Sequence, residues 1–230
     1  MNDLTTPVAA VLWRRLVAEV IGTGLLVSVV IGSGIAAQQL SSDVGLELLE
    51  NTLATVFGLA ALILLFQPLS GAHFNPVVTI ADRLLETRHS VIEIIGYVVA
   101  QIVGAIGGAL LANAMFGVAT TLSMKDRADA GHLLGEIVAT AGLVLLIFAL
   151  VRTGRGALAG PAVAAYIGAA YWFTSSTSFA NPAVTIGRMF SDTFAGIAPG
   201  SAPWFIGAQV VGGTIGIALT TLLFPRKAAK

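Results

Sequence analysis

Two short stretches of the chain nearly repeat each other about half a chain apart, and each lies in an otherwise apolar setting. The stretches run from Phe74 to Ile80 and from Ala180 to Ile186, and both contain Asn-Pro. Asn is a strong N-cap, and Pro suits the first position of a helix. Each Asn-Pro therefore predicts the start of a short helix. Short, Pro-interrupted segments at corresponding places in two halves of a membrane protein indicate a binding or permeation site made from broken helices.

The composition indicates a protein that crosses a membrane several times. Hydrophobic residues make up 56% of the 230 residues and charged residues 10%, whereas a soluble domain carries about 25% charged residues. The formal net charge is zero, which argues against nucleic acid as a partner. The absence of cysteine from the sequence excludes disulfides and thiolate metal sites. No nucleophile with a base and an orienting group is apparent, so we expect neither an enzyme nor a cofactor or metal.

The apolar stretches predict six spanning helices, each near the ~20 residues that a bilayer requires. The six predicted spans are Leu12–Ala37, Leu46–Phe66, Val91–Phe116, His132–Val151, Leu158–Thr174 and Pro203–Phe224. Two further segments, Asn75–Leu85 and Asn181–Asp192, are too short to span. They fit re-entrant half-helices, which are tolerated at membrane depth only inside protein or beside a cavity.

The distribution of basic residues predicts the orientation of the chain. With both termini in the cytoplasm, only Lys125 and Arg127 fall in an outer loop, as the positive-inside rule requires. The two half-helices then enter from opposite sides, which gives an inverted 3+3 repeat with halves of roughly 1–118 and 125–230. The halves form a single channel domain, 1–230, because the site exists only where they meet. The sequence suits a bacterial inner membrane.

Glycine recurs on the predicted spans. Small residues allow membrane helices to approach closely, so we expect tight helix crossings at these positions. The glycines concerned are Gly22, Gly24, Gly104, Gly107, Gly108, Gly207, Gly212, Gly213 and Gly216.

One acidic residue lies inside the first span of each half, Glu19 in the first and Glu136 in the fourth. An acid inside a membrane is costly and faces the protein interior as a rule. One hypothesis is a proton relay or a ligand for a coupling ion. The other is that each carboxylate accepts backbone N–H groups of a re-entrant loop. The matching repeat positions favour this scaffold role.

The segment Ser70–Thr79 resembles the first signature of the aquaporin and aquaglyceroporin family (major intrinsic proteins), and Asn181-Pro182-Ala183 resembles the second. The segments around the two acids match the acidic helices of that family. The resemblance implies an all-α membrane fold with six helices and two half-helices, one pore per subunit and a homotetramer in the lipid bilayer. It also implies that the two Asn side chains donate to permeating oxygens, while the half-helix N-termini add positive potential. The pore centre would be formed by Asn75, Pro76, Val77, Asn181, Pro182 and Ala183.

The chain departs from the family at its most characteristic filter position. Family members carry Arg immediately after the second Asn-Pro-Ala, where this chain has Val184. A guanidinium has five donors and a fixed charge, whereas valine has neither and is shorter. The resemblance therefore implies a wider and less polar constriction.

The other filter positions follow from counting back from the two motifs. Counting gives Thr55 from the second span, Ala169 from the fifth span and Ser178 from the loop, with Phe57 as the alternative to Thr55. With Thr55, the ring that these residues form with Val184 is uniformly small. Such a ring favours small polyols or hydroxylated metalloids over a water-only filter.

Three further residues have two roles open. Arg188 lies one helical turn beyond Val184, where it either restores the missing charge or pairs with Asp192 or a loop carbonyl. Val77 replaces the usual Ala of the first signature and either alters the pore centre or packs between the half-helices. His73 either gates by protonation or orients the re-entrant loop through a hydrogen bond.

The full second signature, Ser178–Phe190, resembles a bacterial branch of the family that is associated with arsenic-resistance operons. This implies passage of arsenite as uncharged As(OH)3, of antimonite and of methylated arsenicals. We therefore predict a passive channel for small neutral solutes, with trivalent metalloid hydroxides first and glycerol and water after them. The alternatives are a water-selective or glycerol channel of the same fold, and a proton-coupled secondary transporter that uses the two buried acids.

Overall fold

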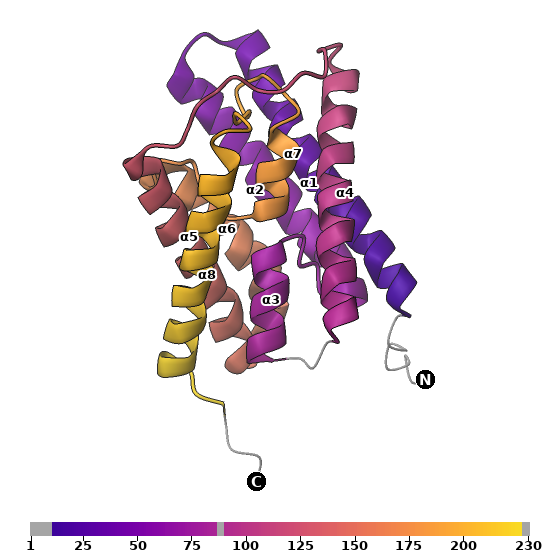
Figure 1. Ribbon diagram of the computed structural model, residues 1–230, viewed down its shortest axis with the longest axis vertical. Coiled ribbons are helices and arrows are strands. Elements are labelled where there is room, and N and C mark those ends of the chain that lie inside the picture. Colours follow the sequence, from indigo (N-terminus) through magenta and orange to yellow (C-terminus); the bar gives the residue numbers. More distant parts are fainter. Residues whose placement is uncertain (1–10, 87–89, 227–230) are drawn as a thin grey trace, which may run out of the picture.

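A computed structural model describes residues 11–86 and 90–226 of the chain (Figure 1). Its helices, in order, are α1 (Leu12–Leu40), α2 (Val44–Ser70), α3 (Pro76–Leu85), α4 (Val91–Met115), α5 (Ala130–Arg152), the short 3-10 helix η1 (Gly156–Leu158), α6 (Ala159–Phe173), α7 (Pro182–Arg188) and α8 (Ala202–Leu223). Six of these segments, with η1 and α6 counted as one, are long and apolar enough to cross a membrane. The prediction of an all-helical membrane protein with six spans is therefore confirmed.

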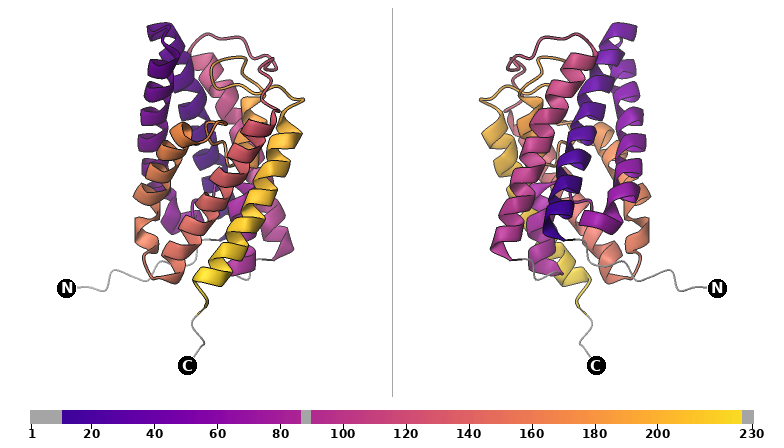
Figure 2. Two further views of the ribbon diagram at one scale, coloured as in Figure 1. Left: turned by 90° about the vertical axis from the view of Figure 1, so that its left-hand side faces the viewer. Right: turned by 90° about the vertical axis from the view of Figure 1, so that its right-hand side faces the viewer.

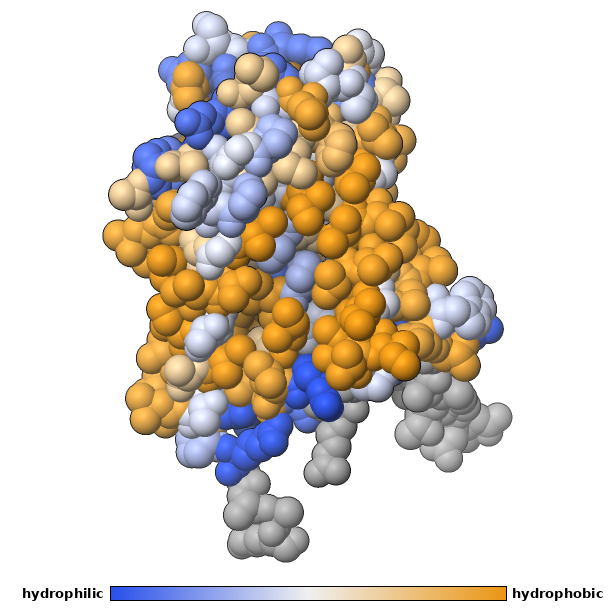
Figure 3. Space-filling model, viewed as in Figure 1, coloured by the Kyte–Doolittle hydropathy of each residue, from blue (hydrophilic) through white to orange (hydrophobic). Residues whose placement is uncertain are grey.

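The outer surface matches a bilayer. Figure 3 shows a broad hydrophobic band around the middle of the molecule, with hydrophilic residues gathered towards its two ends. Large apolar side chains such as Leu65, Ile92 and Leu222 are exposed within the described residues, as lipid-facing side chains of a membrane helix are. The described chain begins and ends at the same end of the molecule (Figures 1 and 2). This arrangement agrees with an even number of crossings.

The two short helices lie end to end in the middle of the bundle. In Figure 1, α3 occupies the lower half and α7 the upper half, and each begins near the centre and runs outward. Helix α3 packs against α4, α5 and α8, and α7 against α1, α4 and α8. Two long helices, a short helix after Asn-Pro and another long helix follow one another in each half of the chain. The exact boundaries of the two repeats stay a prediction.

Glycine lets the long helices of each half touch through their backbones. The most extensive contacts in the bundle join α1 to α4 and α5 to α8. A Cβ atom on Gly104 would overlap the carbonyl oxygen of Val20, and one on Gly108 would overlap that of Gly24. In the other half, Gly212 approaches a carbonyl oxygen of α5 in the same way. Close packing is therefore confirmed at these positions, where only a hydrogen atom fits.

The prediction of tight helix packing is wrong for two of the glycines. Gly107 and Gly207 are exposed, and an added Cβ would meet no heavy atom within 4 Å in the described part of the chain. They lie on the outward faces of α4 and α8. Adjacent residues of a helix point in different directions, so Gly107 faces outward while Gly108 faces α1. Gly22 and Gly213, in contrast, make room for side chains of the α3 region, the ring of Phe74 and the methyl groups of Val77.

The second half-helix is shorter than the predicted segment Asn181–Asp192, because α7 ends at Arg188. Its last carbonyl groups are taken by the loops that cover it. The backbone N–H of Ile197 donates to the carbonyl oxygen of Arg188 at 3.3 Å, and that of Ser123 to Met189 at 2.8 Å. The loops that follow α4 and α7 therefore provide hydrogen-bond donors to the end of the helix.

The glycine contacts predict a sharp contrast between two neighbouring substitutions. Gly108→Ala forces a methyl group into the backbone of α1 and should destabilise the protein by about 1–3 kcal/mol, the usual cost of overpacking. Gly107→Ala is the matched control and should leave stability unchanged or slightly raised, because alanine favours helix. Thermal unfolding of the purified proteins in detergent measures both. Equal midpoints for the two variants would contradict the packing described here.

Candidate solute pathway

Each Asn closes the first turn of its own half-helix. The Oδ1 atom of Asn75 accepts from the backbone N–H of Val77 at 2.9 Å. That of Asn181 accepts from Ala183 at 3.0 Å and from Val184 at 3.2 Å. Pro occupies the first position of both helices. The prediction that each Asn-Pro begins a short helix is therefore confirmed.

The same two Asn side chains also join the half-helices to each other. The Nδ2 group of Asn75 donates to the carbonyl oxygen of Ala180 at 2.7 Å, and that of Asn181 donates to Phe74 at 2.8 Å. Both side chains are buried and border one internal cavity. An amide NH2 has two hydrogens. One hydrogen of each Asn is used in this exchange, and the other is left for an oxygen atom in the cavity.

Glu19 holds the loop that leads into the first half-helix. Its Oε1 atom accepts from the hydroxyl of Ser70 at 2.6 Å and the backbone N–H of His73 at 3.0 Å. Its Oε2 atom accepts from the backbone N–H of Phe74 at 2.7 Å and from Nε2 of Gln101 at 2.8 Å. Four donors therefore surround one carboxylate, two on each oxygen.

Glu136 plays the same part for the second loop. Its two oxygens accept from the backbone N–H groups of Phe179 and Ala180, both at 2.8 Å, and from Nε2 of Gln209 at 2.6 Å. Phe74 and Ala180 have positive φ angles of 50° and 48°, which L side chains rarely adopt. The acids thus give partners to backbone groups that no helix satisfies, in a setting without water. This bonding supports the scaffold hypothesis.

The sequence analysis missed two glutamines that complete these networks. Besides binding the acids, Gln101 donates to the hydroxyl of Thr79 and Gln209 to that of Thr185, both at 2.9 Å. Each glutamine ties an acid to the first turn of a half-helix. A signal was present, because Ala-Gln recurs at the middle of the last span of each half, and a buried amide in a membrane span needs partners.

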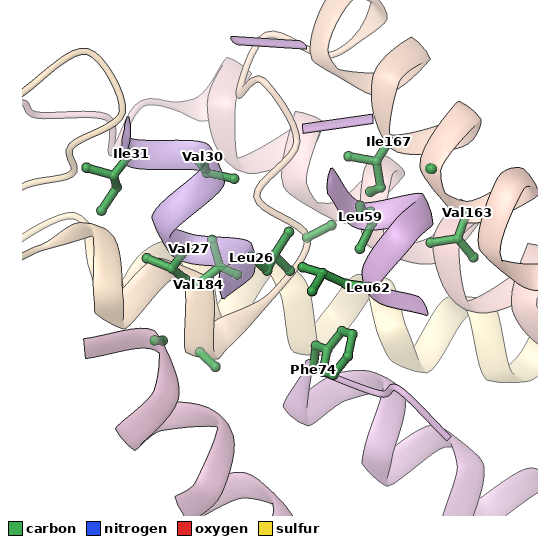
Figure 4. Close-up of a cluster of buried hydrophobic side chains, with 14 of the residues drawn as sticks. Leu26, Val27, Val30, Ile31, Leu59, Leu62, Phe74, Val163, Ile167 and Val184 are labelled. Atoms are coloured by element: carbon green, nitrogen blue, oxygen red, sulfur yellow. The ribbon is translucent and has the colours of Figure 1, made fainter. Parts of the chain in front are cut away.

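One cavity of about 370 Å³ runs past the Asn pair, from Asp82 on α3 to Arg188 on α7. Its size lies within the ~300–1,000 Å³ range of small-molecule sites. Most of the wall is apolar. Figure 4 shows part of it, with Leu26, Leu59 and Val184 from three different helices in one buried cluster. Polar groups are few and lie mainly at the Asn pair and the two ends.

The structure brings three of the expected filter residues to this cavity. Thr55, Ser178 and Val184 border it, and all three are buried. Val184 lies on α7 between Asn181 and Arg188. Phe57, the alternative to Thr55, is 69% exposed on the outside of the bundle. The open choice is therefore decided in favour of Thr55 as the residue that borders the cavity.

Ala169 is a wrong assignment, because it lies on the exposed face of α6. The residues of α6 that border the cavity are spaced four apart on one face of the helix, and they are Ala159, Val163, Ile167 and Tyr171. Ala169 falls between the last two and points away. Tyr171 is the replacement, and its hydroxyl lies 3.2 Å from the hydroxyl of Thr55. The ring of residues is therefore not uniformly small.

His73 borders the cavity on the α3 side of the Asn pair. Its Nδ1 atom lies 3.2 Å from the hydroxyl of Thr79, and its ring packs against Tyr97 with centroids 5.4 Å apart. Its backbone N–H is one of the four donors to Glu19. These contacts support an orienting role, and gating by protonation stays a prediction.

One of the two expectations placed Val77 between the half-helices, and Val77 does not pack there. Its methyl groups fill the space beside Gly213 on α8, and it joins a cluster with Val144 and Phe148 of α5. Counting four residues on from the two buried glutamines makes Ala105 the counterpart of Gly213, while Ala183 is the counterpart of Val77. One contact position between the halves thus pairs a large with a small residue, where the corresponding position has two alanines.

This pairing predicts a compensating double substitution. Gly213→Ala brings a methyl group into Val77 and should cost about 1–3 kcal/mol, and Val77→Ala leaves a gap and should also destabilise the protein. The double variant, Val77→Ala with Gly213→Ala, copies the other half and should be more stable than the sum of the two effects predicts. A thermal-unfolding cycle measures this coupling. Strict additivity would show that the two residues do not compensate each other.

The acid networks predict that Glu136→Gln destabilises the fold. An amide offers one acceptor oxygen where the carboxylate offers two, and its NH2 would face other donors, so a loss of about 1–3 kcal/mol is expected. Glu50→Gln, at the end of the bundle near the start of α2, is the control and should be neutral. Thermal unfolding tests this. A Glu136→Gln protein of unchanged stability would show that the carboxylate does not hold the loop.

Taken together, six membrane-spanning helices around two opposed half-helices, with a narrow passage lined by both, define a membrane channel of the aquaglyceroporin fold. Residues 7–180 match the family model of the major intrinsic proteins, and the chain belongs to that family. Its members are channels and not enzymes, as the sequence analysis expected.

Named relatives agree with this assignment. The chain is 48% identical over 209 residues to the aquaglyceroporin AqpS of Rhizobium meliloti (strain 1021), which covers 90% of this chain and 89% of AqpS. It is 31% identical over 176 residues to the propanediol uptake facilitator PduF of Citrobacter freundii, across 66% of this chain and 64% of PduF. The X-ray structure of the aquaglyceroporin from Plasmodium falciparum superposes with a TM-score of 0.67 at 21% identity, covering 93% of this chain and 95% of that one. This last likeness shows the fold.

Proposed function

We propose that this member of the family is a passive channel for small uncharged solutes that carry several hydroxyl groups, and that trivalent metalloid hydroxides pass best. Arsenite as As(OH)3 and antimonite are the foremost candidates, with methylated arsenicals, glycerol and water after them. The observation that carries the proposal is Val184 on the wall of the cavity. At this place the family resemblance leads us to expect an arginine.

The wall suits a solute with hydroxyl groups on one side and an apolar remainder. Asn75 and Asn181 each keep one N–H for an oxygen in the cavity. The hydroxyl of Ser178 is buried and has no hydrogen-bond partner among the described residues. Opposite groups such as Leu26 and Leu59 are apolar. A compact, uncharged solute with three hydroxyl groups can replace its hydrogen bonds to water with hydrogen bonds to these groups.

Tyr171 changes the expected constriction. With Tyr171 in place of Ala169, the opening beside Val184 is bounded by an aromatic ring whose hydroxyl is paired with Thr55. The small side chain of Val184 is thus partly offset by the large ring of Tyr171 on the wall of the same cavity. Molecules the size of glycerol or As(OH)3 fit this arrangement better than longer polyols such as sorbitol.

The relatives support the solute class. AqpS is named an aquaglyceroporin, and PduF is named a facilitator of propanediol uptake. Both names refer to channels or facilitators for small hydroxylated molecules. For most of the other curated relatives, the match with this chain covers less than two thirds of the relative's length. For human aquaporin-1 it covers 59%.

A proton-coupled transporter is the weaker alternative. Such a mechanism needs an acid that is free to bind and release a proton or ion. All four donors around Glu19 and all three around Glu136 come from the protein itself. This bonding favours a structural role for both acids. We further propose that the channel forms a homotetramer in a bacterial inner membrane with both termini cytoplasmic, as the family resemblance and the basic residues imply.

Liposome flux tests the proposal directly. Liposomes that contain the purified protein are exposed to gradients of arsenite, glycerol or sorbitol, and their shrinkage and re-swelling are followed by light scattering. We expect fast arsenite and glycerol flux and slow sorbitol flux. Val184→Arg should reduce arsenite and glycerol flux about tenfold, which corresponds to about 1.4 kcal/mol of barrier, because the longer side chain narrows the opening.

Each outcome of this experiment has a clear meaning. Flux that is linear in concentration and indifferent to a proton gradient supports a passive channel, whereas saturable flux that follows the gradient supports the transporter. Water flux without arsenite or glycerol flux would replace the proposal with a water channel. Leu65→Ala, on the lipid-facing surface of α2, is the control and should leave every flux unchanged.

A further inference from the structure

One end of the cavity carries a buried positive charge, Arg188, one helical turn away from the filter position where this chain has Val184. Arg188 is the last residue of α7, one turn beyond Val184, and it borders the same cavity. It is only 3% exposed. Its place on the wall makes it the first charged side chain that a solute meets after the outer loops.

Arg188 is held by groups that leave its charge in place. Its Nε atom donates to the carbonyl oxygen of Ala195. The central carbon of its guanidinium lies 3.4 Å from the centre of the Phe179 ring. In the described residues no carboxylate forms a salt bridge with Arg188, since Asp192, four residues on, accepts from Ser123 and Met124 instead. The expected pairing with a loop carbonyl is thus found, and the pairing with Asp192 is not.

A second arginine fixes this arrangement from the loop that joins α4 to α5. Arg127 donates to the carbonyl oxygens of Gly196 at 2.8 Å and Phe194 at 3.1 Å, on either side of the Ala195 carbonyl that Arg188 uses. Its guanidinium also lies 5.4 Å from the Phe179 ring centre. Burial lowers the pKa of Arg127, but arginine stays protonated at neutral pH.

The acidic neighbours of Arg127 do not cancel its charge. Asp126 accepts from the hydroxyl of Ser201 at 2.5 Å and from a backbone N–H. Asp129 caps α5 and binds His132. The oxygens of Glu136 accept from the backbone N–H groups of Phe179 and Ala180 and from Gln209. In the described part of the chain, neither Arg127 nor Arg188 forms a salt bridge with a carboxylate.

We propose that Arg188 is the charge-selecting residue of the outer opening, with Arg127 as the residue that positions it. Its fixed positive charge repels cations from this end of the cavity, whereas an uncharged solute does not meet that barrier. This role rests on the proposed channel function, and it would exclude cations from a channel that has valine at the filter position.

The test separates charge selection from solute passage. Liposomes that contain the channel are assayed for sodium and proton entry under an imposed potential, and for glycerol re-swelling. We expect wild type to be tight to both cations. Arg188→Gln should admit cations at least about tenfold faster, because the rate depends exponentially on the height of the repulsive barrier. It should pass glycerol within about threefold of wild type. Arg188→Lys keeps the positive charge and should stay tight to cations. Arg155→Gln removes an arginine outside the cavity and should change neither flux.

Two more variants keep the result clear if Arg188→Gln folds poorly. Val184→Arg combined with Arg188→Gln moves the charge one turn deeper and should restore tightness to cations. Arg127→Gln, which leaves Arg188 in place but loosens the Ala195 loop, should raise cation entry less than Arg188→Gln does. Cation-tight Arg188→Gln with normal glycerol flux would overturn the proposal for Arg188 and leave the channel function standing. Absence of glycerol and arsenite flux in wild type would instead overturn the proposed solute class.

Discussion

The whole structure depends on giving hydrogen-bond partners to a non-helical backbone inside a membrane. The two loops that precede the half-helices turn back at membrane depth, where lipid offers no hydrogen-bond partners and each unpaired N–H or C=O costs several kcal/mol. Glu19 and Glu136 meet that need by accepting the loop N–H groups directly. A neutral side chain offers fewer acceptor positions. These hydrogen bonds therefore offset the free-energy cost of burying the two acids.

The position of the Asn pair follows from these two acids. Because each acid fixes the backbone just before an Asn-Pro, the carbonyl oxygens of Phe74 and Ala180 are turned towards the opposite half. Each carbonyl receives one hydrogen of the opposite Asn amide. The remaining amide hydrogens are thereby held at the centre of the cavity in a fixed direction. Preorganised donors of this kind bind a passing oxygen without first having to reorganise.

Close helix packing makes the rest of the arrangement possible. Glycine contacts between α1 and α4 and between α5 and α8 bring the glutamines on the outer helices of each pair within reach of the acids and of the half-helices. The half-helices then pack against α1, α4, α5 and α8. The outer loops add a last layer, in which three consecutive carbonyl groups, from Phe194 to Gly196, hold two arginines over one aromatic ring. The outer opening is thus shaped by segments far apart in the sequence.

The sequence by itself determined the elements that depend on local chemistry. Apolar stretches long enough to span, Asn-Pro at a helix start and an acid at matching places in two halves are patterns of neighbouring residues, and each of them reappears in the structure. The shared signatures also identified the family. The register of a helix face near its end was harder to read, so Ala169 was assigned to the wall where Tyr171 lies.

Only the tertiary structure decided which side chains meet across the bundle. Gln101 and Gln209 complete the acid networks, Val77 packs against α8 and not between the half-helices, and Arg188 turns to a loop carbonyl instead of Asp192. These contacts join residues from different helices and loops. Their geometry depends on the crossing angles and loop paths of the whole chain, because a helical pattern fixes which face a residue occupies but not which partner that face will touch.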